Sequence, residues 1–204
     1  MLVYVEYRSR NPAVDLAHFH AIVGRRTDRW ADEFSEDILL LNAARTWRIG
    51  PEPEYLVIYY TPTAGLERLT AWEEIFMSGE AERLEAQTRA TGRIDEAGCF
   101  FPLLEPVPAE RGRYYIEYFD VASDAGRDDV TAFFVSRRDV NQDLTLHLVA
   151  DRIGMLGPHP RGLAIWGIPG YDVLERIATG LDGVSDPIQL VRSGLYADIG
   201  EEIV

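Results

Sequence analysis

The chain of 204 residues is 47% hydrophobic and 11% aromatic, enough apolar material for one large packed domain or two small ones. A formal net charge of −14 argues against nucleic-acid and anionic-membrane partners, because phosphate groups are bound by basic surfaces. The single cysteine, Cys99, excludes an internal disulfide, and neither a basic leader nor an apolar run of membrane length is present. We therefore expect a cytoplasmic protein.

The first half of the chain alternates between strand and helix patterns. Leu2 to Tyr7 alternates as a strand does, and Asn11-Pro12 is typical of a helix start, with asparagine as the N-cap and proline at the first helical position. Apolar spacing and Gly or Pro breaks then predict a helix to about residue 30, strands at 38–47 and 55–60, helices at 66–76 and 80–91, and a strand at 98–104. Without the extra polar helix at 80–91, the order is β-α-β-β-α-β.

A proline-rich segment at 105–112 is a linker by composition, and after it the pattern restarts. Two segments match between the halves: Val3-Tyr4-Val5-Glu6-Tyr7 with Tyr114-Tyr115-Ile116-Glu117-Tyr118, and the Gly-Pro-x-Pro turn at 50–53 with that at 157–160. The second half predicts a helix at 128–140, strands at 144–155 and 163–166, a helix at 171–181 and a strand at 188–199. A repeat of about 105 residues is too long for a solenoid. We predict two domains, 1–106 and 114–204, joined by a linker at 107–113.

This duplicated order resembles the dimeric α+β barrel superfamily, which includes the NIPSNAP-like, the antibiotic-biosynthesis monooxygenase-like and the EthD-like proteins. The resemblance rests on element order and apolar spacing over nearly the whole chain. It implies an α+β fold in which two tandem ferredoxin-like domains pack their antiparallel sheets into a barrel, with the helices outside. It also implies a small-molecule cavity between the sheets. Because such a fold supports many chemistries, the resemblance does not fix a reaction.

Strand alternation predicts which side chains face that cavity. The more apolar face of the two first strands is expected to lie under the helices: Val3, Val5, Tyr114 and Ile116. The opposite face would then line the cavity: Tyr4, Glu6, Tyr115 and Glu117. A glutamate beside a tyrosine at the same position of both halves favours a polar lining, with a solvent-facing edge strand as the alternative.

His147 is the main candidate for a catalytic group. Its strand has an apolar side, which leaves His147 and Asp151 on the side predicted to face the cavity. A carboxylate beside an imidazole orients the ring and raises its pKa, which gives an acid–base group near neutral pH. Glu117 or Asp151 is the predicted carboxylate, and a hydrogen-bonded structural histidine is the competing interpretation.

Three further residues complete the predicted substrate-binding set. Tyr59 and Trp166 occupy matching ends of the third strands and would form an aromatic wall, although aromatic strand residues also commonly fill cores. Asn42 lies in the second strand of the first half, where Leu40 matches His147, so any chemistry would be asymmetric.

These residues predict a cofactor-independent enzyme that moves a proton on a small ligand. The resemblance implies an apolar carbonyl or phenolic compound, and isomerase, lyase, cyclase or monooxygenase-like chemistry. The sequence contains no motif for a nucleotide cofactor, zinc or an α/β-hydrolase, so no cofactor or metal is predicted.

Two other functions stay open. One is a non-catalytic binding or assembly protein, such as a homodimer, whose barrel interior is filled by tyrosine and tryptophan side chains. The other is haem binding through His20, which borders the apolar stripe of the first helix, whereas His18 points elsewhere because two residues span about 200° of a helix.

Overall fold

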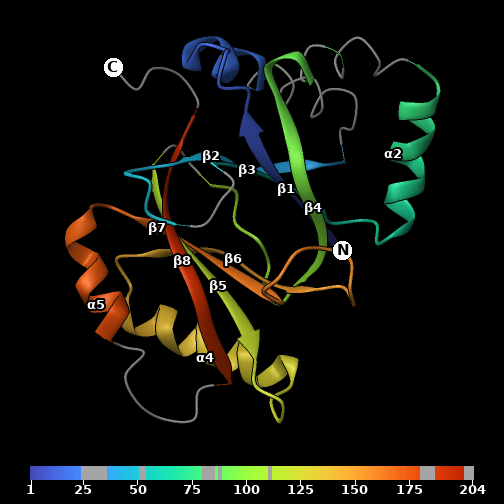
Figure 1. Cartoon of the computed structure of the whole chain (residues 1–204). Coiled ribbons are helices and arrows are strands. Elements are labelled where there is room, and N and C mark those ends of the chain that lie inside the picture. Colours follow the sequence, from blue (N-terminus) through green and yellow to red (C-terminus); the bar gives the residue numbers. More distant parts are fainter. Residues whose placement is uncertain are drawn as a thin grey trace.

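Eight antiparallel strands close into a single barrel in the order β1-β3-β2-β8-β5-β7-β6-β4. The computed structural model describes residues 1–23, 36–50, 54–79, 86, 89–109, 112–179 and 187–199. Helices lie outside the barrel, with α4 running alongside the strands of the second half (Figure 1). The expected α+β fold built on antiparallel strands is confirmed, while the division into two duplicated domains stays a prediction.

The first half supplies β1 (Leu2–Arg10), β2 (Ile38–Arg45), β3 (Tyr55–Thr61), α2 (Glu67–Met77) and β4 (Gly92–Pro102), with helical residues 16–23 after β1. That helix begins later than predicted, because the Oδ1 atom of Asp15 accepts a 2.8 Å hydrogen bond from the backbone of Ala17 and so caps it. Asn11 instead closes a local turn onto Ala13, at 3.0 Å. The predicted end of this helix, and most of the polar helix at 80–91, lie outside the described residues.

The second half supplies β5 (Arg113–Val121), α4 (Arg127–Val140), β6 (Thr145–Arg152), β7 (Gly162–Ile168), a 3-10 turn (Tyr171–Val173) that leads into α5 (Leu174–Thr179), and β8 (Ile188–Asp198). Both halves use one pairing scheme, in which the first strand lies between the third and the fourth. The second strands also share a β-bulge, whose extra residue is Leu40 in β2 and His147 in β6. β2–β8 and β4–β6 pairing then joins the halves.

The barrel interior is a packed core, and the predicted assignment of strand faces is therefore wrong. Val3, Val5, Tyr114 and Ile116 lie in this interior core, together with Leu148, Ala150 and the tyrosines at 7, 118 and 196. The physical reason is closure: a small closed barrel has a narrow dry interior that takes the more apolar face of each strand. Tyrosines fill this interior as the binding-protein alternative predicted, although Trp166 lies outside it.

The outer faces of the strands pack beneath helices in two separate layers. In the first half this layer contains Phe19, Tyr55, Tyr59 and Trp72, and in the second half it contains Tyr115, Phe119, Phe134 and Trp166. The close fit of the second layer is visible at Gly162, where an added Cβ would lie 2.2 Å from a ring carbon of Phe119. Each buried aromatic ring contributes roughly 1.5–3 kcal/mol of transfer free energy.

The predicted linker runs against one end of the barrel. The backbone N–H of Val107 donates to the carbonyl of His147, and that of Ala109 donates to the carbonyl of Leu40, both at 2.9 Å. Ala109 also packs against the interior core. The linker thereby contacts the bulge residues of both halves.

Candidate functional site

Glu117 is fully buried beneath α4 and does not orient His147. Its two carboxylate oxygens accept hydrogen bonds from Arg137 at 2.8 and 3.0 Å, and from the indole N–H of Trp166 at 2.9 Å. The guanidinium of Arg137 also lies 5.3 Å from the ring centroid of Trp166. The sequence could not reveal this partner, because Arg137 comes from a helix rather than from a neighbouring strand.

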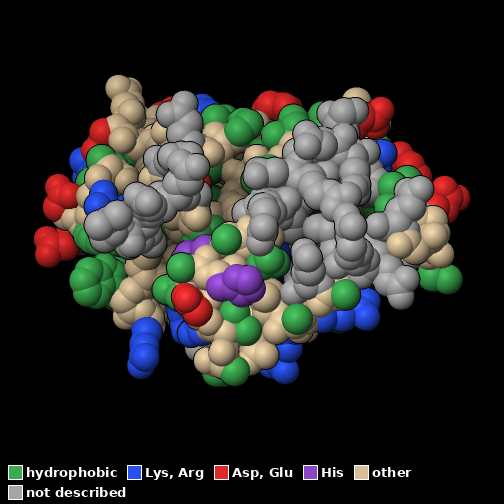
Figure 2. Space-filling view, turned by 90° about the horizontal axis from the view of Figure 1, so that it is seen from above, with side chains coloured by type: hydrophobic (Ala, Val, Ile, Leu, Met, Phe, Trp, Pro, Cys, Tyr) green, Lys and Arg blue, Asp and Glu red, His purple; other side chains and the backbone are tan. Residues whose placement is uncertain are grey.

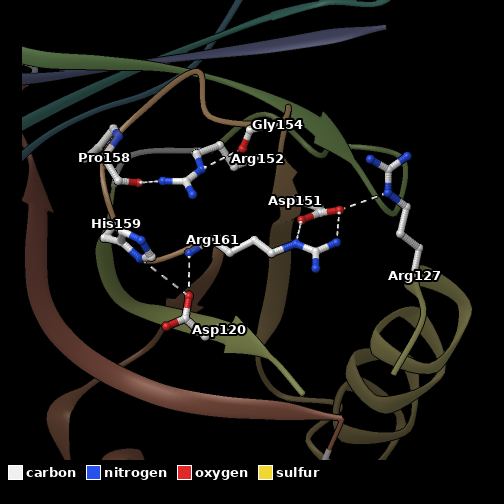
Figure 3. A network of polar contacts seen from close by, with 8 residues as sticks. All are labelled: Asp120, Arg127, Asp151, Arg152, Gly154, Pro158, His159 and Arg161. Atoms are coloured by element: carbon white, nitrogen blue, oxygen red, sulfur yellow. Dashed lines mark hydrogen bonds and ion pairs between the residues drawn. The ribbon is translucent and has the colours of Figure 1, made fainter. Parts of the chain in front are cut away.

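Asp151 also has partners other than His147. Figure 3 shows its carboxylate between Arg127 and Arg161, which donate to it at 2.9 Å and at 2.7 and 3.0 Å. Arg127 belongs to the start of α4, and Arg161 to the loop before β7. Asp151 therefore has a structural role in place of the predicted catalytic one: it connects the loop before β7 to the start of α4.

The neighbouring Arg152 holds the second Gly-Pro-x-Pro turn. Its guanidinium donates to the carbonyl oxygens of Gly154 and Pro158 at 3.2 and 2.8 Å (Figure 3). It also donates to the carbonyl oxygen of Gly157 at 2.9 Å. Three carbonyl acceptors around one buried cation fix the turn, so the sequence motif that marks both halves has a structural role here.

We predict that Asp151→Asn weakens the fold by about 1–3 kcal/mol at pH 7, because a buried acceptor for two arginines is lost. Burial alone would raise the pKa of Asp151, but hydrogen bonds and charge from Arg161 and Arg127 outweigh burial and hold that pKa below its ordinary value. A lowered pKa stabilises the fold above about pH 4, and this stabilisation disappears as the pH falls through the lowered value.

Urea unfolding at pH 7, 5 and 3 measures this effect. The stability of Asp151→Asn should decline less than that of the wild type between pH 5 and 3. The exposed pair of Asp143 with Arg176, at 2.6 Å, provides the control variant Asp143→Asn, which should change stability far less at pH 7. Equal acid sensitivity of Asp151→Asn and the wild type would contradict the prediction.

His147 lies at the barrel end, with 8% of its surface exposed. Its Nδ1 atom is 3.0 Å from the carbonyl oxygen of Val107, and its ring stands edge-on to Tyr114 at 5.8 Å. Because a carbonyl only accepts, Nδ1 bears the proton of the neutral ring and Nε2 is the acceptor. The ring borders a pocket of about 390 Å³. His147, the predicted base, therefore borders a pocket, but the described residues that line this pocket include neither Glu117 nor Asp151.

The predicted substrate-binding residues do not meet in one cavity. Tyr4 packs against Trp72 of α2 at 5.0 Å, and Asn42 lies opposite Val57 in the outer layer of the first half. Tyr59 belongs to that same layer, whereas Tyr115 and Trp166 belong to the layer of the second half. The error follows from the inverted faces: these side chains support helices instead of lining the interior.

Glu6 belongs to a buried pair with unusual hydrogen bonding. Its carboxylate contacts the Nη2 atom of Arg8, a residue that is only 1% exposed. The Nε and Nη1 atoms of Arg8 are buried without a hydrogen-bond partner among the described residues. Arg8 pairs in register with Tyr55, so both side chains lie on the helix-covered face. Buried polar groups are normally satisfied, so these exceptions need an explanation.

His20 contributes a further unsatisfied atom to the same region. Its ring lies 5.7 Å from that of Tyr55, and its Nε2 is buried with no hydrogen-bond partner in the described part of the chain. Burial first, and the charge of Arg10 second, lower the pKa of His20, so the imidazole is held neutral. The Nε atom of Arg10 is also buried without such a partner among the residues described.

A cavity of about 710 Å³ lies where β1 ends beside the starts of β3 and β4. Among the described residues, its wall contains Arg10, Arg89 and Arg93 and one carboxylate, that of Glu54. Figure 2 shows acidic side chains dispersed over the face seen from above, so a wall with three arginines differs from the general surface of this acidic chain. Such a wall attracts anionic groups. Sequence reasoning missed Arg8 and the cavity, since residues far apart in the chain build them.

Sites of two other kinds do not occur in the described residues. No group of three or more His, Cys, Asp or Glu side chains there could hold a metal ion. No helix in the same described ranges is long and apolar enough to cross a membrane.

No family model matches the sequence, and no curated protein matches it. Solved structures do match the fold. A provisionally assigned chlorite dismutase aligns with a TM-score of 0.61 at 10% identity, over 98% of this chain and 96% of that one. A haem-binding protein from Thermus thermophilus aligns at 0.60 and 10%, over 97% and 90%. A mutant chlorite dismutase from Candidatus Nitrospira defluvii in complex with cyanide aligns at 0.58 and 5%, over 97% and 91%.

Identities this low establish the fold alone. They leave the resemblance to NIPSNAP-like, monooxygenase-like and EthD-like proteins a prediction, and they do not support the cofactor-independent enzyme that the sequence suggested. This chain is therefore an α+β barrel similar in fold to chlorite dismutase-like and haem-binding proteins.

Proposed function

We propose that the chain binds haem, or a closely related tetrapyrrole, in the helix-covered layer of its first half. The observation that supports this most is the buried Nε2 atom of His20, which has no hydrogen-bond partner among the described residues. A neutral imidazole is the form that ligates haem iron, and the lowered pKa of His20 favours that form. The similar fold of a haem-binding protein adds independent support.

The surrounding side chains suit the other parts of such a ligand. Phe19 and Tyr55, whose rings are 4.5 Å apart, offer flat apolar surfaces beside His20. Arg8 and Arg10 have buried guanidinium nitrogens without a hydrogen-bond partner in the described ranges. Arginine binds carboxylates such as propionates through paired hydrogen bonds. The arginine-walled cavity of about 710 Å³ falls within the range of roughly 300–1,000 Å³ typical of ligand sites.

Ligand binding would also relieve an energetic penalty of the free protein. Each buried polar group without a partner destabilises a fold by about 1–3 kcal/mol. Haem would supply redox chemistry when bound, while His20 would hold it and the two arginines would orient it. We therefore expect binding to raise the unfolding temperature.

Titration of the purified chain with haemin, followed by absorbance in the Soret region, tests the proposal. The wild type should give a saturable spectrum of a histidine-ligated haem, and His20→Ala should bind at least tenfold more weakly with an altered spectrum. His18→Ala is the matched control, because His18 is an exposed histidine on the same helix. If His20→Ala and the wild type give the same spectrum and affinity, His20 is not the ligand and the proposal fails.

A further inference from the structure

We propose that Asn42 binds a small protic molecule, one with an O–H or N–H group, beside haem in the helix-covered layer of the first half. This inference rests on the proposed function and adds a second ligand to the same site. The Oδ1 atom of Asn42 is buried with no hydrogen-bond partner among the described residues. An amide oxygen only accepts hydrogen bonds, so the molecule that it recognises must bring a donor.

The sheet register places Asn42 beside the groups assigned to haem. Tyr55 of β3 lies opposite Arg8 of β1 on one side and opposite Ala44 of β2 on the other. Asn42 is two residues from Ala44, so it shares the face of Tyr55 and is its diagonal neighbour, at a Cα separation of about 7–8 Å. The ring of His20 stands edge-on to that of Tyr55 at 5.7 Å. Two strands and a helix therefore bring three polar groups together around one tyrosine.

Haem can match two of these three groups, but not the third. In the proposed complex His20 holds the iron and Arg8 binds a propionate. Propionates are ionised at neutral pH, and the ring nitrogens of haem are bound to iron, so haem itself has no O–H or N–H to donate. The acceptor atom of Asn42 therefore recognises a further molecule that has such a group.

The surroundings of Asn42 favour a small neutral molecule. Val57, its partner in β3, and Ile199, whose backbone N–H donates to the carbonyl of Asn42 at 3.1 Å, are buried apolar residues of the same layer. Burial of an ion among apolar side chains costs far more than burial of a neutral molecule with one hydrogen bond. Water, an alcohol or an azole has the required donor without a charge.

The haemin-loaded chain tests this assignment with imidazole and 1-methylimidazole, which differ in a single N–H. Both bind ferric haem through one ring nitrogen, and Soret absorbance follows each titration. The wild type should prefer imidazole, and Asn42→Leu should reduce that preference about three- to tenfold, the increment of one hydrogen bond. Without haemin, Asn42→Leu should unfold about 2–4 °C above the wild type, because it removes a buried acceptor that has no partner in the described ranges.

Asn141→Leu is the matched control. The Oδ1 atom of Asn141 is also buried without a partner among the residues described, but Asn141 lies at the end of α4 in the second half. This variant should keep the wild-type preference for imidazole. Far-UV circular dichroism verifies that each variant is folded, and Asn42→Ala takes the place of Asn42→Leu if the latter does not fold.

The haemin titration separates the two proposals. If the wild type does not bind haemin, the proposed function fails and this inference fails with it. If the wild type and Asn42→Leu both bind haemin and show the same preference for imidazole over 1-methylimidazole, Asn42 recognises no protic ligand. That result overturns this inference alone and leaves the haem proposal standing.

Discussion

Glu117→Gln is expected to lower the free energy of unfolding by about 3–5 kcal/mol, because it breaks a buried ion pair and leaves the other charge uncompensated. Glu117 is 0% exposed and the side chain of Arg137 only 11%, so water cannot readily solvate the arginine that remains. Glutamine keeps the shape and one acceptor oxygen, which restricts the change to the charge and one hydrogen bond. Urea unfolding at pH 7 measures the loss.

Two comparison variants define the origin of that loss. Asp139→Asn removes one partner of an exposed pair with Arg138 on the same helix, and it should change stability by less than about 1 kcal/mol. The double variant Glu117→Leu with Arg137→Met removes both charges together and should recover most of the lost stability. A loss below about 1 kcal/mol for Glu117→Gln would show that the pair does not hold α4 on the sheet.

Element order and the correspondence between halves could be predicted because they are local properties. Strand alternation and helix spacing are readable within short windows, and the repeated segments align β1 with β5 without knowledge of the fold. The predicted match of Leu40 with His147 agrees with the structure, in which both are bulge residues. Helix starts were less accurate, since Asn11 and Asp15 both have capping chemistry.

The choice of barrel face could not be predicted from the strands alone. Alternation separates Val5 from Glu6 but does not state which of them points inward, and that choice depends on closure of all eight strands. A glutamate that recurs in both halves therefore predicts a cavity lining that the closed barrel does not have. In the structure the glutamate of the second half, Glu117, accepts hydrogen bonds from Arg137 of α4 and from Trp166 of β7.

The buried polar atoms of the first half that lack hydrogen-bond partners among the described residues could not be predicted from the sequence either. Arg8 is one charged residue near the end of a strand, and nothing in its sequence neighbours indicates complete burial. What distinguishes Arg8 is that its Nε and Nη1 atoms donate no hydrogen bond to the described residues, which only the three-dimensional arrangement reveals. The two halves thus share one strand pattern but differ in the hydrogen bonding of their buried arginines, since Arg137 donates to Glu117 while two nitrogens of Arg8 lack partners among the described residues.

The double variant Glu6→Gln with Arg8→Met is expected to leave the free energy of unfolding of the ligand-free chain unchanged or raised by up to about 2 kcal/mol, in contrast to Glu117→Gln, because it removes both charges of a buried pair together. Methionine removes two buried nitrogens that lack partners among the described residues while it preserves much of the packing volume, and glutamine leaves no uncompensated charge at position 6. Under the haem proposal the same change should weaken haemin binding by about 10- to 100-fold, because a charge-assisted hydrogen bond is lost.

Urea unfolding without ligand and Soret titration with haemin measure the two effects in the same preparation. A gain or no change in stability together with weaker binding would show that Arg8 is kept for a ligand at the expense of the free fold, as functional sites commonly are. Arg68→Met is a suitable control, because Arg68 is a mostly buried arginine of the same half whose Nε donates to Asp37 at 3.2 Å. That variant should lose stability and retain haemin affinity. If the double variant instead destabilises the chain as Glu117→Gln does and still binds haemin normally, the nitrogens of Arg8 that lack partners among the described residues have no part in ligand binding.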